Sequence, residues 1–113
     1  MLINLSNNQI LASQIGQAYT FLGRLKGLMF TKELPTGCAL HIRPCRSVHT
    51  FFMNYSIDVL YLNADLKIVA IDEQLRPGKV GPIYADAVSV IELPAGAARQ
   101  TETQIGHFVQ LRP

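Results

Sequence analysis

The sequence predicts an α+β, mostly-β domain in which a small, barrel-like mixed sheet packs around one main helix at about residues 20–30. About seven short apolar runs have the length and composition of strands, and a single stretch has helical periodicity. Apolar residues make up 49% of the 113 residues and charged residues only 16%. This balance excludes a disordered chain, and we expect residues 1–113 to form a single domain with a buried core.

The strand-like runs occur on both sides of the helix. Residues 2–5 and 9–15 flank the turn sequence Ser-Asn-Asn and predict a hairpin. Residues 75–82 are the longest irregular stretch and a natural place for a mobile loop, while residues 97–101 predict one helical turn. The other predicted strands, each bounded by turn residues, cover residues 38–43, 47–53, 57–62, 66–72, 88–93 and 107–111.

The predicted helix begins after Thr20, which can act as its N-cap. Phe21, Leu25 and Leu28 then fall at helical spacing and form an apolar stripe. Two glycines four residues apart weaken the helix by about 1 kcal/mol each relative to alanine. They would also let another part of the chain approach the helix closely on one side.

Charge and hydropathy limit the partners and the location. Ten lysines and arginines against eight aspartates and glutamates leave a net charge of +2, too small and too scattered to predict a nucleic-acid partner. No stretch reaches the roughly 18 to 20 apolar residues needed to cross a membrane. The first ten residues lack the features of a signal peptide. We therefore expect a cytoplasmic protein in which Cys38 and Cys45 remain thiols.

The segment from residue 45 to residue 62 combines polar and apolar side chains in two strand-like runs. Read as a strand, the first run places His49 on one face with Phe51 and Met53, and both faces are apolar enough for interior sheet. The second run, residues 57–62, carries Asp58 among large apolar residues. A carboxylate in such a run must find a partner or become neutral.

Four motifs in order resemble one known family. They are R-L-K-G-L-M-F at residues 24–30, C-R-S-V-H-T-F-F-M at residues 45–53, I-D-V-L-Y-L at residues 57–62 and I-E-L-P-A-G at residues 91–96. Together they resemble the domain of unknown function family 192 (DUF 192), a set of small, mainly bacterial and archaeal domains. The resemblance runs from about Gly23 to the C-terminus. It implies a compact, mostly-β fold and supplies no agreed activity.

Two positions differ from the pattern of that family. Leu66 stands where the family usually has the turn glycine, so the turn geometry of the family does not transfer directly to this hairpin. His107 follows Gly106 where an acid is usual, so a role for that acid does not transfer to this chain.

Four polar residues embedded in the apolar motifs are the candidate ligand-binding residues: Arg24, His49, Asp58 and Glu92. A cluster of these side chains could bind a polar ligand, or it could be a buried network that fixes the sheet register. Burying an unpaired carboxylate is unfavourable by several kcal/mol. We therefore predict that Asp58 or Glu92 is hydrogen-bonded to Arg24 or His49.

Cys45 and His49 are also candidates for a catalytic nucleophile and its base, with neighbouring arginines favouring a thiolate. The same two residues complete the spacing C-x2-H-x3-C-x3-H with Cys38 and His41, which are zinc-ligand types. On a strand, residues three apart face opposite sides. The sequence therefore does not predict a metal site, and no motif indicates a cofactor.

We interpret the chain as a small domain that binds an unknown small polar ligand or a protein partner, with a polar cluster around His49 and Asp58. Neither nucleic acid nor a membrane is an expected partner. One alternative is an enzyme that uses Cys45 and His49, and another is a purely structural or accessory protein.

Overall fold

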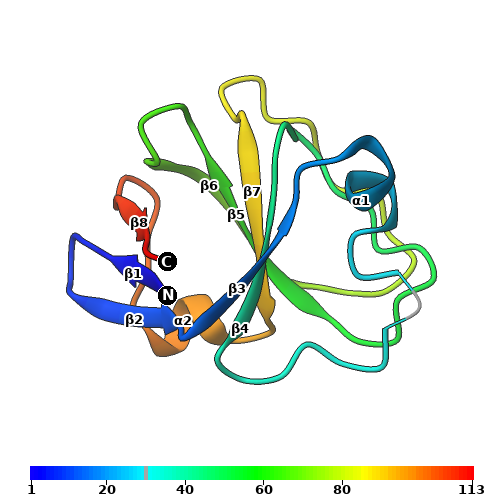
Figure 1. The fold of residues 1–113 in the computed structure, drawn as a ribbon, viewed down its shortest axis with the longest axis horizontal. Coiled ribbons are helices and arrows are strands. Elements are labelled where there is room, and N and C mark those ends of the chain that lie inside the picture. Colours follow the sequence, from blue (N-terminus) through cyan, green and yellow to red (C-terminus); the bar gives the residue numbers. More distant parts are fainter. Residues whose placement is uncertain (30) are drawn as a thin grey trace.

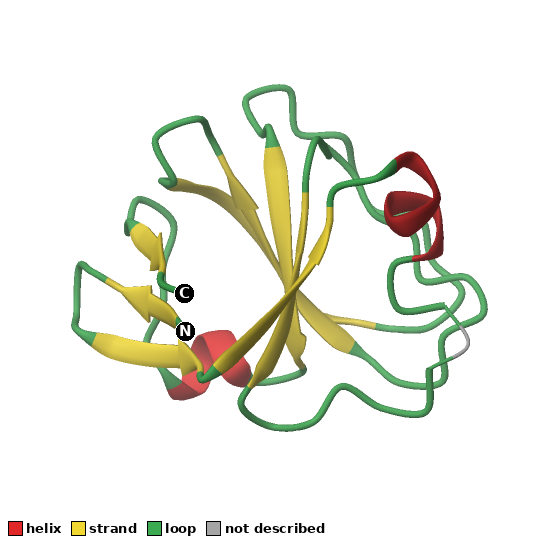
Figure 2. Ribbon diagram, in the orientation of Figure 1, coloured by secondary structure: helices red, strands yellow, loops and turns green. Residues whose placement is uncertain are grey.

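The computed structural model describes residues 1–29 and 31–113, and for residues 21, 22 and 25 it describes the backbone only. Two short helices lie at opposite ends of a molecule that otherwise consists of strands and loops (Figure 2). The elements are β1 (Leu2–Asn4), β2 (Gln9–Ala12), β3 (Gln14–Ala18), α1 (Phe21–Lys26), β4 (Cys38–Ile42), β5 (Ile57–Leu62), β6 (Ile68–Leu75), β7 (Ser89–Pro94), α2 (Ala97–Gln100) and β8 (Val109–Leu111).

The strands form two sheets, which confirms the mostly-β prediction (Figure 1). The smaller sheet has the order β2-β1-β8, and the larger has the order β3-β4-β7-β5-β6. Strands β3 and β4 are parallel and the other pairs are antiparallel, so the larger sheet is mixed, as predicted. The two sheets curve around a common core without closing into a barrel.

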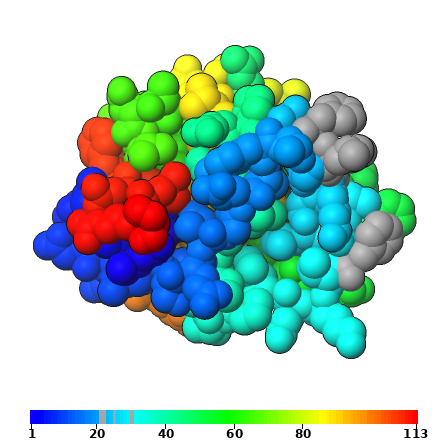
Figure 3. Space-filling model, viewed as in Figure 1, coloured from blue at the N-terminus to red at the C-terminus, as the bar shows by residue number. Residues whose placement is uncertain are grey.

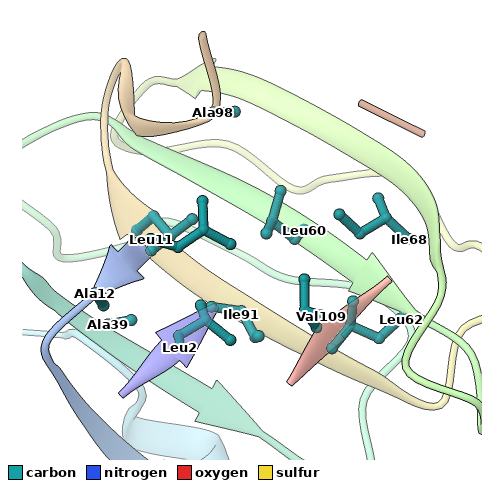
Figure 4. Close-up of a cluster of buried hydrophobic side chains, with 11 residues drawn as sticks. Leu2, Leu11, Ala12, Ala39, Leu60, Leu62, Ile68, Ile91, Ala98 and Val109 are labelled. Atoms are coloured by element: carbon teal, nitrogen blue, oxygen red, sulfur yellow. The ribbon is translucent and has the colours of Figure 1, made fainter. Parts of the chain in front are cut away.

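The central strands β5 and β7 of the larger sheet are buried on both faces. One face packs against the smaller sheet, with Leu60, Leu62, Ile91 and Leu93 meeting Leu2, Leu11 and Val109 (Figure 4). The opposite face packs toward α1 and the loop before β5, with Ile57, Val59, Tyr61 and Val90 meeting Leu28, Val48 and Met53. Burial on both faces explains why residues 57–62 are apolar almost throughout rather than alternating.

The two ends of the chain lie side by side on one face of the molecule (Figure 3). Strand β1 pairs with β8, and the Met1 ammonium donates to the carbonyl of Arg112 at 2.6 Å. Neither helix of the described residues has the length and apolar content that a membrane-spanning helix needs.

The predicted strand at residues 47–53 is wrong. This segment is a loop in which His49 makes an isolated bridge to Val80, and Phe51 and Phe52 are exposed at a turn. Phe52 has a φ of 62°, which no extended strand contains. The apolar composition of this segment therefore led to the prediction of an interior strand where the structure has an exposed turn. Met53 is buried, as expected.

The stretch predicted to be irregular, residues 75–82, is so except for Leu75, which ends β6, and the loop that it belongs to covers residues 76–84 beside the first loop. Backbone hydrogen bonds join it to the loop at residues 47–53. The Thr50 carbonyl accepts the N–H of Gly78, and the Thr50 N–H donates to the carbonyl of Lys79. The N–H of Gly81 donates to the carbonyl of Val48. At its far end, the Tyr84 hydroxyl donates to Asp72. The two loops therefore form one cross-linked surface.

Helix α1 is shorter than the predicted range of residues 20–30. Thr20 caps it, because its hydroxyl accepts from the backbone N–H of Gly23, and Gly27 ends it with a φ of 48°. The side chains of the predicted stripe at residues 21 and 25 lie outside the described part of the chain. The predicted helical turn at residues 97–101 corresponds to α2.

Both differences from the family pattern have a visible local role. Leu66 adopts a φ of 61°, the conformation that glycine takes without strain, and its side chain packs on the core instead. His107 accepts hydrogen bonds at Nδ1 from the Asn4 amide and the Gln104 backbone. A histidine nitrogen therefore acts here as a hydrogen-bond acceptor, as a carboxylate would.

Asp58 is fully buried on the face of β5 that meets the smaller sheet. Its two oxygens accept the backbone N–H groups of Gln74 and Ala98, both at 2.9 Å. These bonds tie β5 to the end of β6 and to the first residues of α2. Gln74 has a φ of 52°, so the bond also holds an unfavourable backbone conformation in place.

Replacing Asp58 with Ala is expected to lower the free energy of unfolding by about 3 kcal/mol, because the buried N–H of Ala98 and the part-buried N–H of Gln74 would lose their acceptor. Denaturant-induced unfolding followed by circular dichroism measures this. The matched control is Asp65→Ala, which removes an exposed carboxylate from a turn and should change stability by less than about 0.5 kcal/mol. Equal effects for the two variants would contradict the structural role of Asp58.

Candidate functional site

A cavity of about 60 Å³ lies on the face of the larger sheet that is remote from the smaller sheet. Its wall comes from the end of α1, from β4 and β7 and from the loop at residues 45–53. The polar residues of the wall are Arg24, Lys26, Cys45, Ser47, His49 and Glu92, and the apolar residues are Leu28, Met29, Ile42, Val48 and Met53. Three of the four motifs, at residues 24–30, 45–53 and 91–96, therefore contribute to this cavity. They bring three of the four predicted ligand-binding residues, Arg24, His49 and Glu92, into its wall.

Glu92 is the acid of the cavity and is only 3% exposed. It lies between Leu40 and Val59 on the neighbouring strands, in an apolar setting. Within residues 1–29 and 31–113 its carboxyl has neither a hydrogen bond nor an ion pair. Burial raises its pKa from 4.5 to about 7. Glu92 is therefore a desolvated acid that is poised between its two protonation states near neutral pH.

The end of α1 lies against the Glu92 carboxyl. A Cβ atom at position 27 would lie 3.5 Å from Oε1 of Glu92, and the backbone there has positive φ. Glycine therefore serves the positive φ of the helix end, whereas 3.5 Å from the acid is an ordinary van der Waals distance for a Cβ atom.

Arg24 and Lys26 bring positive charge to the same cavity. Arg24 is half-buried, and its Nη1 donates to the carbonyl of Tyr19 at 3.2 Å. Because a guanidinium carries five N–H donors, the others are available to a ligand. Lys26 is exposed at the rim.

Cys45 is half-buried, and its thiol donates to the carbonyl of Ser47 at 2.9 Å. Burial raises its pKa, and the nearby Glu92 raises it further, while the Ser47 bond and Arg24 act in the opposite direction. A thiol that donates its proton to a carbonyl is protonated. The expectation that arginines favour a thiolate at this position is therefore not met.

His49 lies at the mouth of the cavity, where its ring stacks on Phe51 with centroids 5.4 Å apart. Its Nδ1 accepts the backbone N–H of Phe51 at 3.2 Å. In the neutral ring the proton is therefore on Nε2, which makes that nitrogen a donor.

The predicted hydrogen bond between an acid and Arg24 or His49 is wrong for the described residues. Asp58 lies on the opposite face of the sheet from Glu92 and is satisfied by backbone N–H groups. Adjacent strands place the two acids close in register, but side-chain alternation points them to opposite sides. Asp58 therefore does not belong to the cluster around His49.

The zinc-type spacing does not bring its four residues together. His41 is buried beside Tyr19, whose hydroxyl lies 2.6 Å from Nδ1, and it faces away from the cavity wall formed by Ile42. Burial, with a smaller contribution from Arg43, lowers the pKa of His41 to about 4. Nowhere in the described sequence do three histidine, cysteine or acidic side chains group closely enough to hold a metal ion.

Sequence reasoning missed Lys26, Ser47 and the role of Gly27. Lys26 and Gly27 lie inside the motif at residues 24–30, and Ser47 lies inside the motif at residues 45–53. The motifs thus carried the signal, but polar type alone did not reveal which members reach the cavity.

Comparison with known proteins gives a family. Residues 2–111 match the model of DUF192, described as "Uncharacterized ACR". The chain belongs to the DUF192 family. It is 32% identical to the UPF0127 protein PH1112 of Pyrococcus horikoshii over 97% of both chains. It is also 31% identical to a UPF0127 protein of Thermococcus sibiricus, over 94% of this chain and 71% of the relative.

Solved structures support the same fold for this DUF192 chain. A crystal structure of a protein of unknown function from Novosphingobium aromaticivorans matches with a TM-score of 0.79 and 20% identity, over 86% of this chain and 74% of that one. A Sinorhizobium meliloti structure, whose description proposes a transcription regulator, matches with a TM-score of 0.76 and 19% identity, over 85% and 79% of the two chains. At such identities the likeness concerns the fold alone.

The raised pKa of Glu92 makes stability depend on pH in a defined direction. Between about pH 4.5 and 7 the native carboxyl keeps a proton that the unfolded chain has released, so this contribution to stability falls as pH rises through 7. Glu92→Gln is neutral at every pH. It is expected to be more stable than the natural protein by about 3 kcal/mol at pH 8 and by little at pH 4.5.

Urea unfolding of both proteins at a series of pH values measures this difference. Glu33→Gln, which neutralises an exposed acid, is the matched control and should follow the natural protein. A difference between Glu92→Gln and the natural protein that does not grow with pH would contradict the raised pKa.

Proposed function

We propose that this domain is a binding module whose cavity at Glu92 receives a small polar group, from a free ligand or from a protein partner. The observation that carries the proposal is a buried carboxyl that faces a cavity without a hydrogen-bond partner in the described chain. Burial disfavours the charged form of such a carboxyl, and a ligand that pairs with it can offset this cost. A cavity with a few convergent polar groups is the usual form of a binding site.

The surroundings of the cavity support a site that is formed before the ligand arrives. The loops at residues 47–53 and 76–84 are joined by backbone hydrogen bonds, and the Ser47 hydroxyl donates to Gly81 across them. Exposed apolar side chains, among them Phe51, Val80 and Ile83, extend from these loops. They would give a larger ligand or a partner additional contact area beside the mouth.

A protein or small-molecule partner, rather than nucleic acid or a membrane, is part of this proposal. So is a cytoplasmic location, which is supported by two cysteines that are both free thiols. The small net charge of +2 also favours these partners over nucleic acid.

The geometry at Cys45 opposes the alternative of an enzyme with a Cys45 nucleophile. The thiol proton is engaged by the Ser47 carbonyl, and Nδ1 of His49 is occupied by the Phe51 N–H. A nucleophilic cysteine needs a lowered pKa, whereas burial raises that of Cys45.

Cys45 is therefore expected to alkylate slowly. With iodoacetamide at pH 7, Cys45 in a Cys38→Ser background should react more slowly than Cys38 in a Cys45→Ser background, as followed by mass spectrometry. His49→Ala should change the Cys45 rate by less than about twofold. Fast alkylation that slows markedly in His49→Ala would favour the enzyme.

The binding proposal is tested by selective 13C labelling of the methionine methyl groups. The chain has three methionines, of which Met29 and Met53 line the cavity and Met1 does not. In a panel of small carboxylates, amines, polyols and nucleosides, at least one class should shift the Met29 and Met53 signals while Met1 stays constant. A panel without such a compound would overturn the proposal.

Two substitutions at one position supply the control. Cys45→Met fills the cavity without changing its charges, whereas Cys45→Ala leaves it open. Binding should be lost in the first variant and kept in the second. Equal binding by both would mean that the ligand occupies another site.

A further inference from the structure

We propose that the group received by this cavity is a carboxylate, held by the Arg24 guanidinium and by a protonated Glu92 that donates its O–H to the ligand. The inference rests on the proposed binding function and adds the chemical class of the ligand. In the bound state a proton lies between two carboxyl groups, and where Glu92 was ionised beforehand that proton is taken from solvent.

The charges in the cavity wall favour an anion. From α1 come Arg24 and Lys26, both cationic, and the loop at residues 45–53 contributes the Cys45 thiol and His49. On the far side lies the Tyr55 hydroxyl, which pairs with Thr31. The neighbouring strands β4 and β5 present only apolar side chains at the register of Glu92. Two cations against one desolvated acid attract an anion into the cavity and repel a cation.

The hydrogen-bonding groups left free in the wall are mainly donors. Arg24 spends one N–H on the Tyr19 carbonyl and has others left. His49 has its Nδ1 occupied, so its neutral ring offers Nε2–H. Neutral Glu92 adds an O–H. A carboxylate, with two oxygens and no donor, complements such a set, and its bond to a guanidinium is charge-assisted.

The size and lining of the cavity fit the end of a molecule rather than a whole metabolite. A volume of about 60 Å³ holds a carboxylate with a short alkyl stem, and Ile42, Val48 and Met53 offer that stem an apolar wall. A free short-chain acid and the C-terminus of a peptide share this chemistry.

The alternative, an ammonium group paired with ionised Glu92, uses the same acid in its other protonation state. It would bring a third cation toward Arg24 and Lys26 in a partly desolvated site. The two possibilities differ in sign. Carboxylate binding needs protonated Glu92 and weakens as pH rises above about 7, whereas ammonium binding needs the ionised form and strengthens.

The experiment uses the intact protein with labelled methionine methyl groups in buffers free of carboxylates. The pH values are about 5.5, 6.5, 7.5 and 8.5, which extend about 1.5 units on either side of neutrality. The probes are propionate, N-acetylalanine, N-acetylalaninamide and methylammonium. We expect the two carboxylates to shift Met29 and Met53, and the amide and the amine to leave them unchanged. The Kd of the carboxylates should rise by about tenfold per pH unit well above 7.

Glu92→Gln separates the two possibilities. The Gln amide donates as a protonated acid does, so this variant should bind carboxylates at pH 8.5 about as well as the natural protein binds them at pH 5.5, with little pH dependence. Any pH dependence of the Kd that remains in this variant arises from groups other than Glu92. Arg24→Gln should weaken carboxylate binding by about tenfold or more, whereas Lys32→Gln, which lies outside the cavity, should not.

Each other outcome has a definite meaning. Methylammonium binding that is lost in Glu92→Gln would overturn the carboxylate assignment and leave the binding function intact. Carboxylate binding that is lost in Glu92→Gln would overturn the role of protonated Glu92. Binding of another class from the broader panel alone would overturn this inference only, and no binding at all would overturn both proposals.

A stronger response to N-acetylalanine than to propionate would identify a peptide C-terminus as the source of the carboxylate. The reverse order would identify a free short-chain acid.

Discussion

Burial of strands β5 and β7 on both faces is the constraint on which the rest of the structure depends. Strands β5 and β7 each send alternate side chains into two separate cores, so a polar residue in either strand is enclosed whichever way it points. Asp58 and Glu92 occupy such positions one register step apart, on opposite faces. The two acids therefore have separate surroundings and share no hydrogen-bond partner among the described residues.

The two acids meet this constraint in different ways. Asp58 is saturated by backbone N–H groups from β6 and α2, which is how a buried carboxylate stabilises a fold. Glu92 lies against an apolar wall and an open cavity, beside the end of α1 at Gly27. Asp58 joins three elements of the fold through hydrogen bonds, whereas the Glu92 carboxyl has no such bond in the described chain. This contrast is the physical reason for the structural role of the first acid and for the proposal that the second binds a ligand.

The sequence was sufficient where local chemistry decides the outcome. Thr20 as N-cap, the mixed sheet and the apolar run at residues 57–62 follow from capping, periodicity and burial. The motifs also located three of the four predicted ligand-binding residues at one cavity. The error at Phe51 and Phe52 arose because two exposed aromatic residues at a turn have the composition of a buried strand. The face to which Asp58 points depends on register, which is a tertiary property.

The candidate site combines hydrogen-bonded loops with one acid, Glu92, whose protonation can change. The loops at residues 47–53 and 76–84 are fixed to each other by backbone bonds, and the thiol and hydroxyl of the wall are engaged by carbonyls. Little backbone ordering therefore remains for a ligand to bring about, which favours binding of even a small group. The variable element is the Glu92 carboxyl, because its pKa near 7 lets a modest change in its surroundings alter its charge. A desolvated acid beside a cavity is the feature of this chain on which the proposed binding function rests.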